Sequence, residues 1–277
     1  MTDHELRLKS IHYRRDLLTY IYRAGAGHTG GSLSCVDILN VLYNCVLRVS
    51  PERFCDPNRD RYIQSKGHSV EALYVVLADR GFFPKSDLET LCRYKSPYVG
   101  HPTRKVPGIE MNTGALGHGL PISVGLALAG KMDSAPYRVF ALLGDGELAE
   151  GSNWEAAMAA AHYELDNLTA ILDHNTLQIT GRTRDVCSNE PIDEKFQAFG
   201  WTVRCVDGHD FAQLIRALTD SPTAGKPTCV IANTVKGRGV SFMEDVVKWH
   251  HGVPAESEFE KALADLARQE AELAEAS

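Results

Sequence analysis

From Arg138 onward, short apolar runs alternate with helical patterns, and this alternation constrains the fold more than any other feature of the sequence. Strands separated by helices form parallel sheets that are covered by helices on both faces. Such sheets bind ligands beyond the carboxyl ends of their strands. The sequence therefore predicts an α/β fold with a ligand site at that edge. The expected strands are Val139–Leu143, Leu168–Leu172, Val203–Val206 and Thr228–Ala232, and the expected helices are Trp154–Tyr163, Glu194–Phe199 and Phe211–Leu218.

The N-terminal half adds further helices and one short strand. An amphipathic helix is expected from Leu6 to Arg23, followed by a glycine-rich turn at Gly25–Gly31. A second helix is expected to begin at Ser34, whose hydroxyl can cap it. The other expected elements are a strand at Arg61–Gln64, helices at Glu71–Asp79 and Ser123–Lys131, a loop at Gly100–Gly119 and an acidic helix at Glu256–Ser277. Because the pattern contains no repeat or linker, we expect one domain spanning residues 1–277.

Composition argues against several classes of function. The chain has 277 residues, 44% of them hydrophobic, which is enough for one large core. The formal net charge is −7 and no cluster of Lys and Arg is present, which argues against nucleic acid and anionic membranes as partners. The polar N-terminus is unlike a secretory signal, and seven cysteines without a CxxC pair indicate neither disulfides nor zinc. We expect a cytoplasmic protein.

The strongest local signal is Gly144-Asp145-Gly146, which follows an expected buried strand. Alone, this tripeptide is also typical of a tight turn with an Asx cap. The next strand ends just before Asn175 and Leu177, and the ends of neighbouring parallel strands meet at one edge. A carboxylate, an amide oxygen and a main-chain carbonyl suit Mg²⁺ or Ca²⁺ and leave positions for phosphate oxygens. We therefore predict that Asp145, Asn175 and the carbonyl of Leu177 hold a metal that bridges a diphosphate.

This pairing of Gly-Asp-Gly with Asn resembles the thiamine diphosphate signature of a large enzyme superfamily. Within that superfamily, the chain from Gly27 to about Pro254 resembles the N-terminal, diphosphate-binding module of transketolases. The resemblance implies a thiamine diphosphate-binding fold and transfer of a two-carbon ketol unit from a ketose phosphate to an aldose acceptor. The similar segments are Gly27-His28-Thr29-Gly30-Gly31, Ser65-Lys66-Gly67-His68, Gly100-His101-Pro102, residues 114–119, residues 144–151, Lys236-Gly237-Arg238-Gly239 and Trp249-His250-His251-Gly252.

The resemblance also implies roles for single residues. The histidines implied to be catalytic are His28, His68, His101 and His251, with His250 as the alternative to the last. The residues implied to bind the cofactor are His68, Gly114, Ala115, Leu116, Gly146, Asn175, Lys236 and His251. Glu150 resembles an acidic residue at the contact between two active sites, although a carboxylate just before a helix also has a structural explanation.

In transketolases, the glutamate that activates the aminopyrimidine lies in a domain that follows this module. The resemblance therefore implies a split enzyme, in which a separate C-terminal subunit supplies the pyrimidine-binding domain and two copies of each chain assemble. The residues that select the sugar phosphate are expected mainly in that second chain, so the sequence leaves pentose phosphates, sulfonated sugars and branched sugars open as substrates.

Other thiamine diphosphate proteins remain as alternatives. A deoxyxylulose-phosphate synthase and a 2-oxoacid dehydrogenase subunit share the Gly-Asp-Gly and Asn site, but Gly100-His101-Pro102 and the segment from Trp249 to Gly252 favour transketolase. A non-catalytic cofactor-binding subunit is the other alternative, and the complete set of histidines argues against it.

Overall fold

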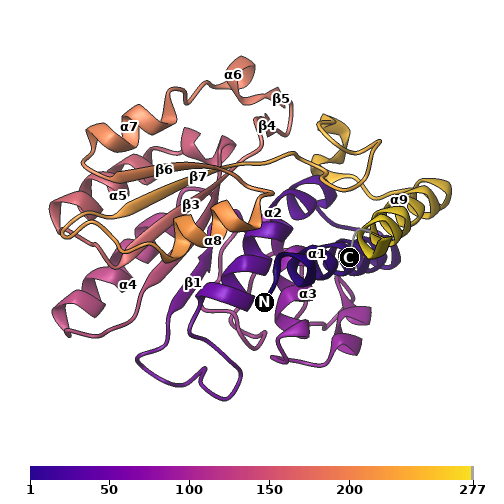
Figure 1. Ribbon diagram of the computed structural model, residues 1–277, viewed down its shortest axis with the longest axis horizontal. Helices are drawn as coiled ribbons and strands as arrows, with labels where there is room; N and C mark the ends of the chain where they lie inside the picture. The colour runs from indigo at the N-terminus through magenta and orange to yellow at the C-terminus, as the bar shows by residue number, and fades with distance from the viewer. Residues whose placement is uncertain (276–277) are drawn as a thin grey trace.

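The computed structural model describes residues 1–275 and has a central five-stranded parallel sheet with the order β1-β2-β3-β7-β6 (Figure 1). The strands are β1 (Arg61–Gln64), β2 (Val139–Gly144), β3 (Leu168–His174), β6 (Thr202–Asp207) and β7 (Thr228–Asn233). Every strand predicted from the sequence is present. Strands β2 and β3 are neighbours, and their register pairs Gly144 with Asp173. The loops that follow β2 and β3 therefore leave the sheet at the same edge.

Alternate residues of β2, β3 and β7 pack into two different cores, because helices cover both faces of the sheet (Figure 1). On β2, Phe140 and Leu142 belong to one core, whereas Ala141 and Leu143 belong to the other. The helices of the first core are α1 (Asp3–Ala24), α2 (Thr29–Val41), α3 (Val70–Asp79), α8 (Phe211–Thr219) and α9 (Glu256–Glu275). Those of the second core are α4 (Gly119–Met132), α5 (Gly151–His162) and α7 (Ile192–Ala198). Figure 1 shows α9 alongside α1.

Helix α2 begins at Thr29, so the predictions of a turn through Gly31 and of a helix start at Ser34 were wrong. The reason is tertiary packing. A Cβ on Gly30 would lie 2.8 Å from the carbonyl oxygen of Trp249, so only glycine allows this close approach inside a helix. The hydroxyl of Ser34 does not cap the helix but donates to the carboxylate of Asp173 at 2.6 Å.

The chain between β3 and β6 contains elements that the sequence did not predict. A short antiparallel hairpin, formed by β4 (Leu177–Gln178) and β5 (Gly181–Arg182), follows β3 directly. The short helix α6 (Thr183–Val186) comes next. Each strand of the hairpin has only two residues, too few for an alternating apolar pattern to reveal it.

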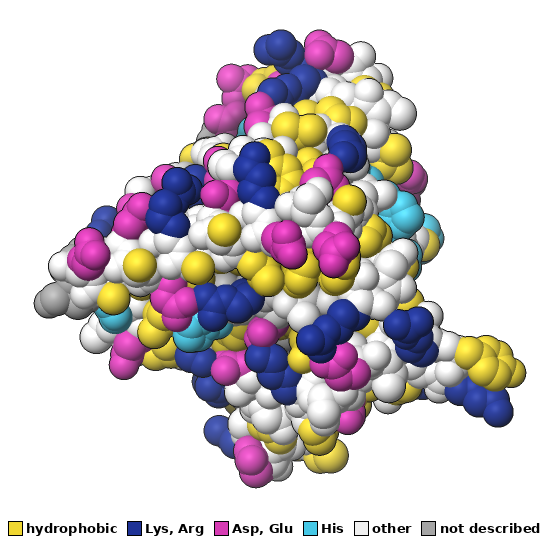
Figure 2. Space-filling view, turned by 90° about the vertical axis from the view of Figure 1, so that its right-hand side faces the viewer, with side chains coloured by type: hydrophobic (Ala, Val, Ile, Leu, Met, Phe, Trp, Pro, Cys, Tyr) yellow, Lys and Arg dark blue, Asp and Glu magenta, His cyan; other side chains and the backbone are white. Residues whose placement is uncertain are grey.

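The surface carries charges of both signs. Figure 2 shows acidic and basic side chains intermixed on the face that lies around α1, α3 and α9. This mixed face differs from the concentrated basic area that nucleic acid requires. Within residues 1–275, none of the helices combines the length and the apolar character needed to cross a membrane.

Candidate functional site

A cavity of about 420 Å³ lies at the carboxyl ends of β2 and β3, where the sequence predicts the ligand site. The predicted site residues that line it are His28, His68, Gly114, Leu116, Asp145, Gly146, Asn175, Leu177 and Lys236. His250, the alternative to His251, also lines it. His101, Ala115 and His251 are not part of the lining and are exposed.

The carboxylate of Asp145 is one of the buried acidic groups that line this cavity. Asp145 follows β2 directly and is only 3% exposed. One carboxylate oxygen accepts a hydrogen bond from the amide of Gly146 at 2.8 Å, and the other accepts one from the amide of Thr176. Burial, together with the nearby charge of Asp173, raises the pKa of Asp145 to about 6. A cation bound here would favour the ionised carboxylate.

The other two predicted metal ligands lie beside this carboxylate. The Asn175 amide nitrogen donates to Asp173 at 3.1 Å, and its oxygen accepts from the amide of Leu177 at 3.2 Å. The Leu177 carbonyl accepts from the Lys236 ammonium at 2.9 Å. Within residues 1–275, no group of three or more His, Cys, Asp or Glu side chains is arranged to hold a metal. One carboxylate with neutral oxygens suits a hard divalent cation that takes its remaining ligands from a bound molecule.

Four histidines gather around His28. The ring centroid of His28 lies 4.5 Å from that of His251, 5.4 Å from that of His68, and 5.9 Å from those of His101 and His250. Burial, followed by the neighbouring His251, lowers the pKa of His28 to about 4. Burial also lowers the pKa of His250 to about 3 and that of His68 well below its usual value. The rings of His28, His68 and His250 are therefore neutral near pH 7 and can both donate and accept hydrogen bonds.

The two adjacent histidines His250 and His251 occupy different positions. His250 lies inside the cavity, stacks on His68 with ring centroids 5.3 Å apart, and contacts the Lys236 ammonium at 2.8 Å through Nδ1. His251 is exposed and packs against His28. The predicted cofactor contact of His251 stays a prediction. Of these two histidines, His250 is the one that faces the cavity.

The loop containing Gly114 approaches its neighbours closely. Gly114 has φ 127°, and a Cβ there would lie 2.3 Å from the His101 ring. A side chain on Gly117 would similarly meet Glu150, 2.5 Å from its Cβ. Glycine is therefore required at both positions. Glu150 itself is exposed, so a contact with a second active site stays a prediction.

Sequence reasoning missed a buried ion pair between Lys66 and Asp173. Both side chains are at most 1% exposed, and the Lys66 ammonium donates to the Asp173 carboxylate. Although burial opposes its charge, Asp173 raises the pKa of Lys66. Lys66 lines the cavity, whereas Asp173 holds Ser34 and Asn175 from behind. The only signals in the sequence are a Lys in the Ser-Lys-Gly-His segment and an Asp at the end of an apolar strand.

A second missed residue is Glu147, which joins three loops at the cavity. Its carboxylate is 2% exposed and accepts hydrogen bonds from the amide of Gly117 at 3.0 Å, the amide of Gly144 at 3.1 Å and the hydroxyl of Ser65. Burial raises its pKa. Its position directly after Gly-Asp-Gly was the available signal. The hairpin residues 178–180 also line the cavity, and no sequence pattern indicated their position there.

Comparison with known proteins gives consistent matches. A family profile described as "Transketolase, thiamine diphosphate binding domain" matches residues 8–269. An apulose-4-phosphate transketolase subunit of Phocaeicola vulgatus is 48% identical, over 95% of this chain and 94% of its own length. The 6-deoxy-6-sulfo-D-fructose transketolase subunit SqwG of Clostridium sp. is 40% identical, over 92% of this chain and 94% of its own length.

Solved structures match the same region of larger proteins. Transketolase from Leishmania mexicana superposes with a TM-score of 0.83 at 27% identity, over 99% of this chain and 45% of its own. A transketolase mutant from Pichia stipitis gives a TM-score of 0.85 at 26% identity, over 98% of this chain and 44% of its own. The chain thus spans less than half the length of these solved proteins.

Proposed function

The chain belongs to the transketolase family, and from this premise we propose that it works as the cofactor-binding subunit of a two-chain transketolase. The family match over residues 8–269 and the shared parallel α/β fold confirm the sequence-based identification. A C-terminal partner, with two copies of each chain, is proposed because relatives of similar length are named as subunits. We also propose that residues 1–277 form one domain, because both cores share one sheet. A cytoplasmic location is a further part of the proposal.

The observation that supports this function best is that a buried carboxylate and the neutral rings of His28, His68 and His250 share one cavity. Thiamine diphosphate, when bound, supplies a nucleophilic carbon that breaks and forms carbon–carbon bonds. We propose that Asp145, Asn175 and the carbonyl of Leu177 hold Mg²⁺ or Ca²⁺ at its diphosphate. Lys236 offsets further phosphate charge, and its own pKa of about 8, lowered by burial and by Lys66, rises when an anion is close.

The histidines supply hydrogen bonds and protons at the substrate oxygens. A neutral ring donates from one nitrogen to a carbonyl oxygen and accepts from a hydroxyl at the other. His28 is suited to both, because its Nδ1 is buried and has no protein partner. His101 and His251 lie against His28 and form the exposed side of the group. His68 and His250 are closer to the proposed diphosphate position, next to Lys236.

A reconstitution experiment tests the proposed function. The chain is mixed with its C-terminal partner, thiamine diphosphate and Mg²⁺, and ketol transfer to aldose acceptors is followed by product analysis. The donors include apulose-4-phosphate, which is named for the 48% identical relative, a sulfonated ketose and a pentulose phosphate. We expect transfer from at least one donor by the complex, none by the chain alone, and transfer lowered by about a hundredfold in a complex carrying His28→Ala. Strong transfer by the isolated chain would contradict the two-subunit proposal.

A further inference from the structure

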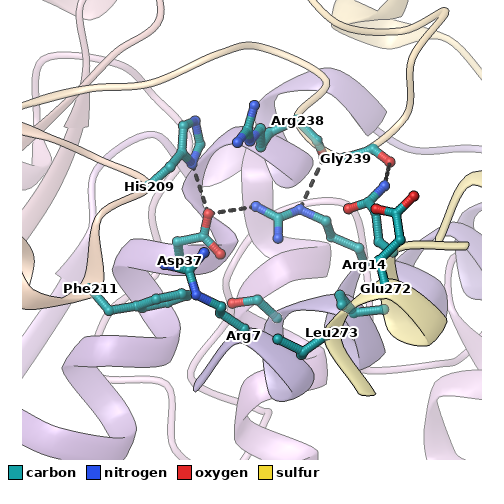
Figure 3. A pocket seen from close by; sticks show the side chains of 12 residues that line it. Arg7, Arg14, Asp37, His209, Phe211, Arg238, Gly239, Glu272 and Leu273 are labelled. Carbon is teal, nitrogen blue, oxygen red and sulfur yellow. Dashed lines mark hydrogen bonds and ion pairs between the residues drawn. The ribbon is translucent and has the colours of Figure 1, made fainter. Parts of the chain in front are cut away.

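The loop of residues 235–239 is a wall shared by two cavities. Lys236 lines the cofactor cavity, whereas Arg238 and Gly239 line a second cavity of about 400 Å³. The second cavity is bounded by side chains of α1, α2 and α9 and by His209 and Phe211 at the start of α8 (Figure 3). Whatever fixes this loop therefore also fixes Lys236.

A buried network of three side chains lies on the second cavity's side of the loop. The Asp37 carboxylate oxygen Oδ2 accepts from Arg14 Nη2 and from His209 Nδ1, each at 2.7 Å (Figure 3). The exposed fractions of the three side chains are 4%, 6% and 10%, respectively. Burial opposes the ionisation of Asp37, but Arg14 and His209 outweigh it and hold the pKa of Asp37 well below its usual range. The network is therefore a buried unit built around an ionised carboxylate.

This network holds the loop near both of its ends. The amide of Val235 donates to His209 Nε2 at 2.9 Å, so this nitrogen carries no proton and Nδ1 is the one that donates to Asp37. At the other end, Arg14 Nε donates to the carbonyl of Arg238 at 3.0 Å. One buried carboxylate thus orients two side chains that bind the backbone on either side of Lys236.

The loop has little room to move away from this position. Gly237 and Gly239 have φ of 84° and 93°, a conformation that favours glycine. A Cβ on Gly239 would lie 2.8 Å from Arg14 Cδ, and a Cβ on Gly237 would lie 2.2 Å from the Met243 carbonyl oxygen. The amide of Gly237 also donates to the carbonyl of Gly30 at 3.0 Å. The backbone is therefore packed closely enough to transmit a change at the network.

We propose that Arg14, Asp37 and His209 are positioning residues for the cofactor cavity. They fix residues 235–239 so that the Lys236 ammonium reaches the Leu177 carbonyl at 2.9 Å and His250 at 2.8 Å. None of the three lines the cofactor cavity, so their effect passes through the loop. The step from Lys236 to cofactor affinity rests on the proposed function, whereas the step from the network to the loop does not.

Two substitutions at His209 separate the two bonds of its ring. In His209→Gln, the side-chain oxygen can take the place of Nε2 and accept from the Val235 amide. In His209→Asn, the side-chain nitrogen can take the place of Nδ1 and donate to Asp37, but the Val235 amide loses its acceptor. Amide hydrogen exchange of the full chain, without cofactor, measures the result. We expect exchange at residues 235–239 to become about tenfold faster in His209→Asn than in His209→Gln, the loss of roughly one hydrogen bond.

Cofactor binding to the complex with the partner subunit measures the second step. The probe is thiamine diphosphate with Mg²⁺, and its dissociation constant is determined by calorimetry. We expect His209→Asn to weaken binding about fivefold and His209→Gln to leave it within about twofold of the unmodified protein. In a Lys236→Met background, His209→Asn should weaken binding no further, because the effect passes through Lys236. Arg7→Gln, a change in the second cavity without a bond to the loop, is the control.

The outcomes separate this inference from the proposed function. Equal exchange at residues 235–239 in His209→Asn and His209→Gln would overturn the inference, whatever the cofactor does. An additional loss of affinity in the Lys236→Met background would overturn it as well, because the network would then act by another route. If the unmodified complex does not bind thiamine diphosphate, the proposed function fails, and the exchange comparison still decides whether the network holds the loop.

Discussion

The two cavities on either side of residues 235–239 both contain a histidine and a buried aspartate, but only in the second cavity do other protein groups pair with both of them. In the second cavity, both ring nitrogens of His209 are hydrogen-bonded, and Asp37 is paired with Arg14. In the cofactor cavity, Nδ1 of His28 is buried without a partner, and none of the arginines and lysines within residues 1–275 is bonded to Asp145. The same residue types are thus balanced by the chain itself in one place and left incomplete in the other.

The pKa values express this difference. Arg14 and His209 overcome the burial of Asp37 and lower its pKa, whereas burial and Asp173 raise that of Asp145. The balance at Asp37 is one of charge, since its Oδ1 has no hydrogen-bond partner. Buried groups whose charge or hydrogen bonds the protein does not satisfy are candidates for ligand binding. Paired groups of the same type serve structure and position.

The largest expected effect that tests this comparison is that of Asp145→Asn. Removing one charge from a buried ionic site costs about 3–5 kcal/mol, so Mg²⁺-dependent binding of thiamine diphosphate should weaken by about a thousandfold. Calorimetric titration of the complex measures it. Asp210→Asn, at the half-buried N-cap of α8, is the control and should bind normally. An affinity for Asp145→Asn close to that of the unmodified complex would exclude Asp145 as a metal ligand.

A pair of histidine substitutions should separate catalysis from stability. His28→Ala should lower kcat/KM for ketol transfer by about a hundredfold, the usual contribution of a proton-transfer group, and leave urea unfolding unchanged. His209→Ala should lower the free energy of unfolding by about 2 kcal/mol, because it removes one of the two donors to Asp37 and leaves the Val235 amide without an acceptor. Similar unfolding curves for the two variants would contradict the view that His209 stabilises the fold and His28 does not.

The third expected effect is on stability alone and concerns Glu71, a buried carboxylate behind His28. Its oxygens accept from the His28 amide at 3.2 Å and the Ser32 hydroxyl at 2.8 Å, and burial raises its pKa to about 7. This pKa lies above the value of about 4.3 in the unfolded chain, so ionisation of Glu71 disfavours the folded state. The free energy of unfolding therefore falls as the pH rises from about 4 to about 7. Glu71→Gln removes this titration. The free energy of unfolding of the variant, relative to that of the unmodified chain, should therefore rise by about 2 kcal/mol between pH 5 and pH 8.

Urea unfolding of the two proteins at several pH values measures this gain. The amide of the variant keeps the size of the original side chain and can still accept one hydrogen bond, so packing around His28 is preserved. Parallel stability curves for the two proteins would show that Glu71 has an ordinary pKa in the folded chain.

Much of the site could be predicted because its residues follow local patterns. Asp145, Asn175 and Leu177 come directly after two strands with clear apolar runs, and neighbouring parallel strands bring their ends together. The histidines at 28, 68 and 101 were accessible only through short motifs that resemble a family. His250 and His251 could not be separated, because one residue of register decides which ring turns into the cavity.

By itself the sequence determined the alternating strands and helices, the strand-end position of Asp145 and the similarity to transketolases, since each depends on residues close together in the chain. Only the tertiary structure decided the start of α2 at Thr29, the ion pair of Lys66 with Asp173, and the network that reaches Lys236 through His209. The partners in that ion pair are 107 residues apart, and His209 and Asp37 are 172 apart. No local pattern marks such pairs, because burial and packing select them only when the fold is complete.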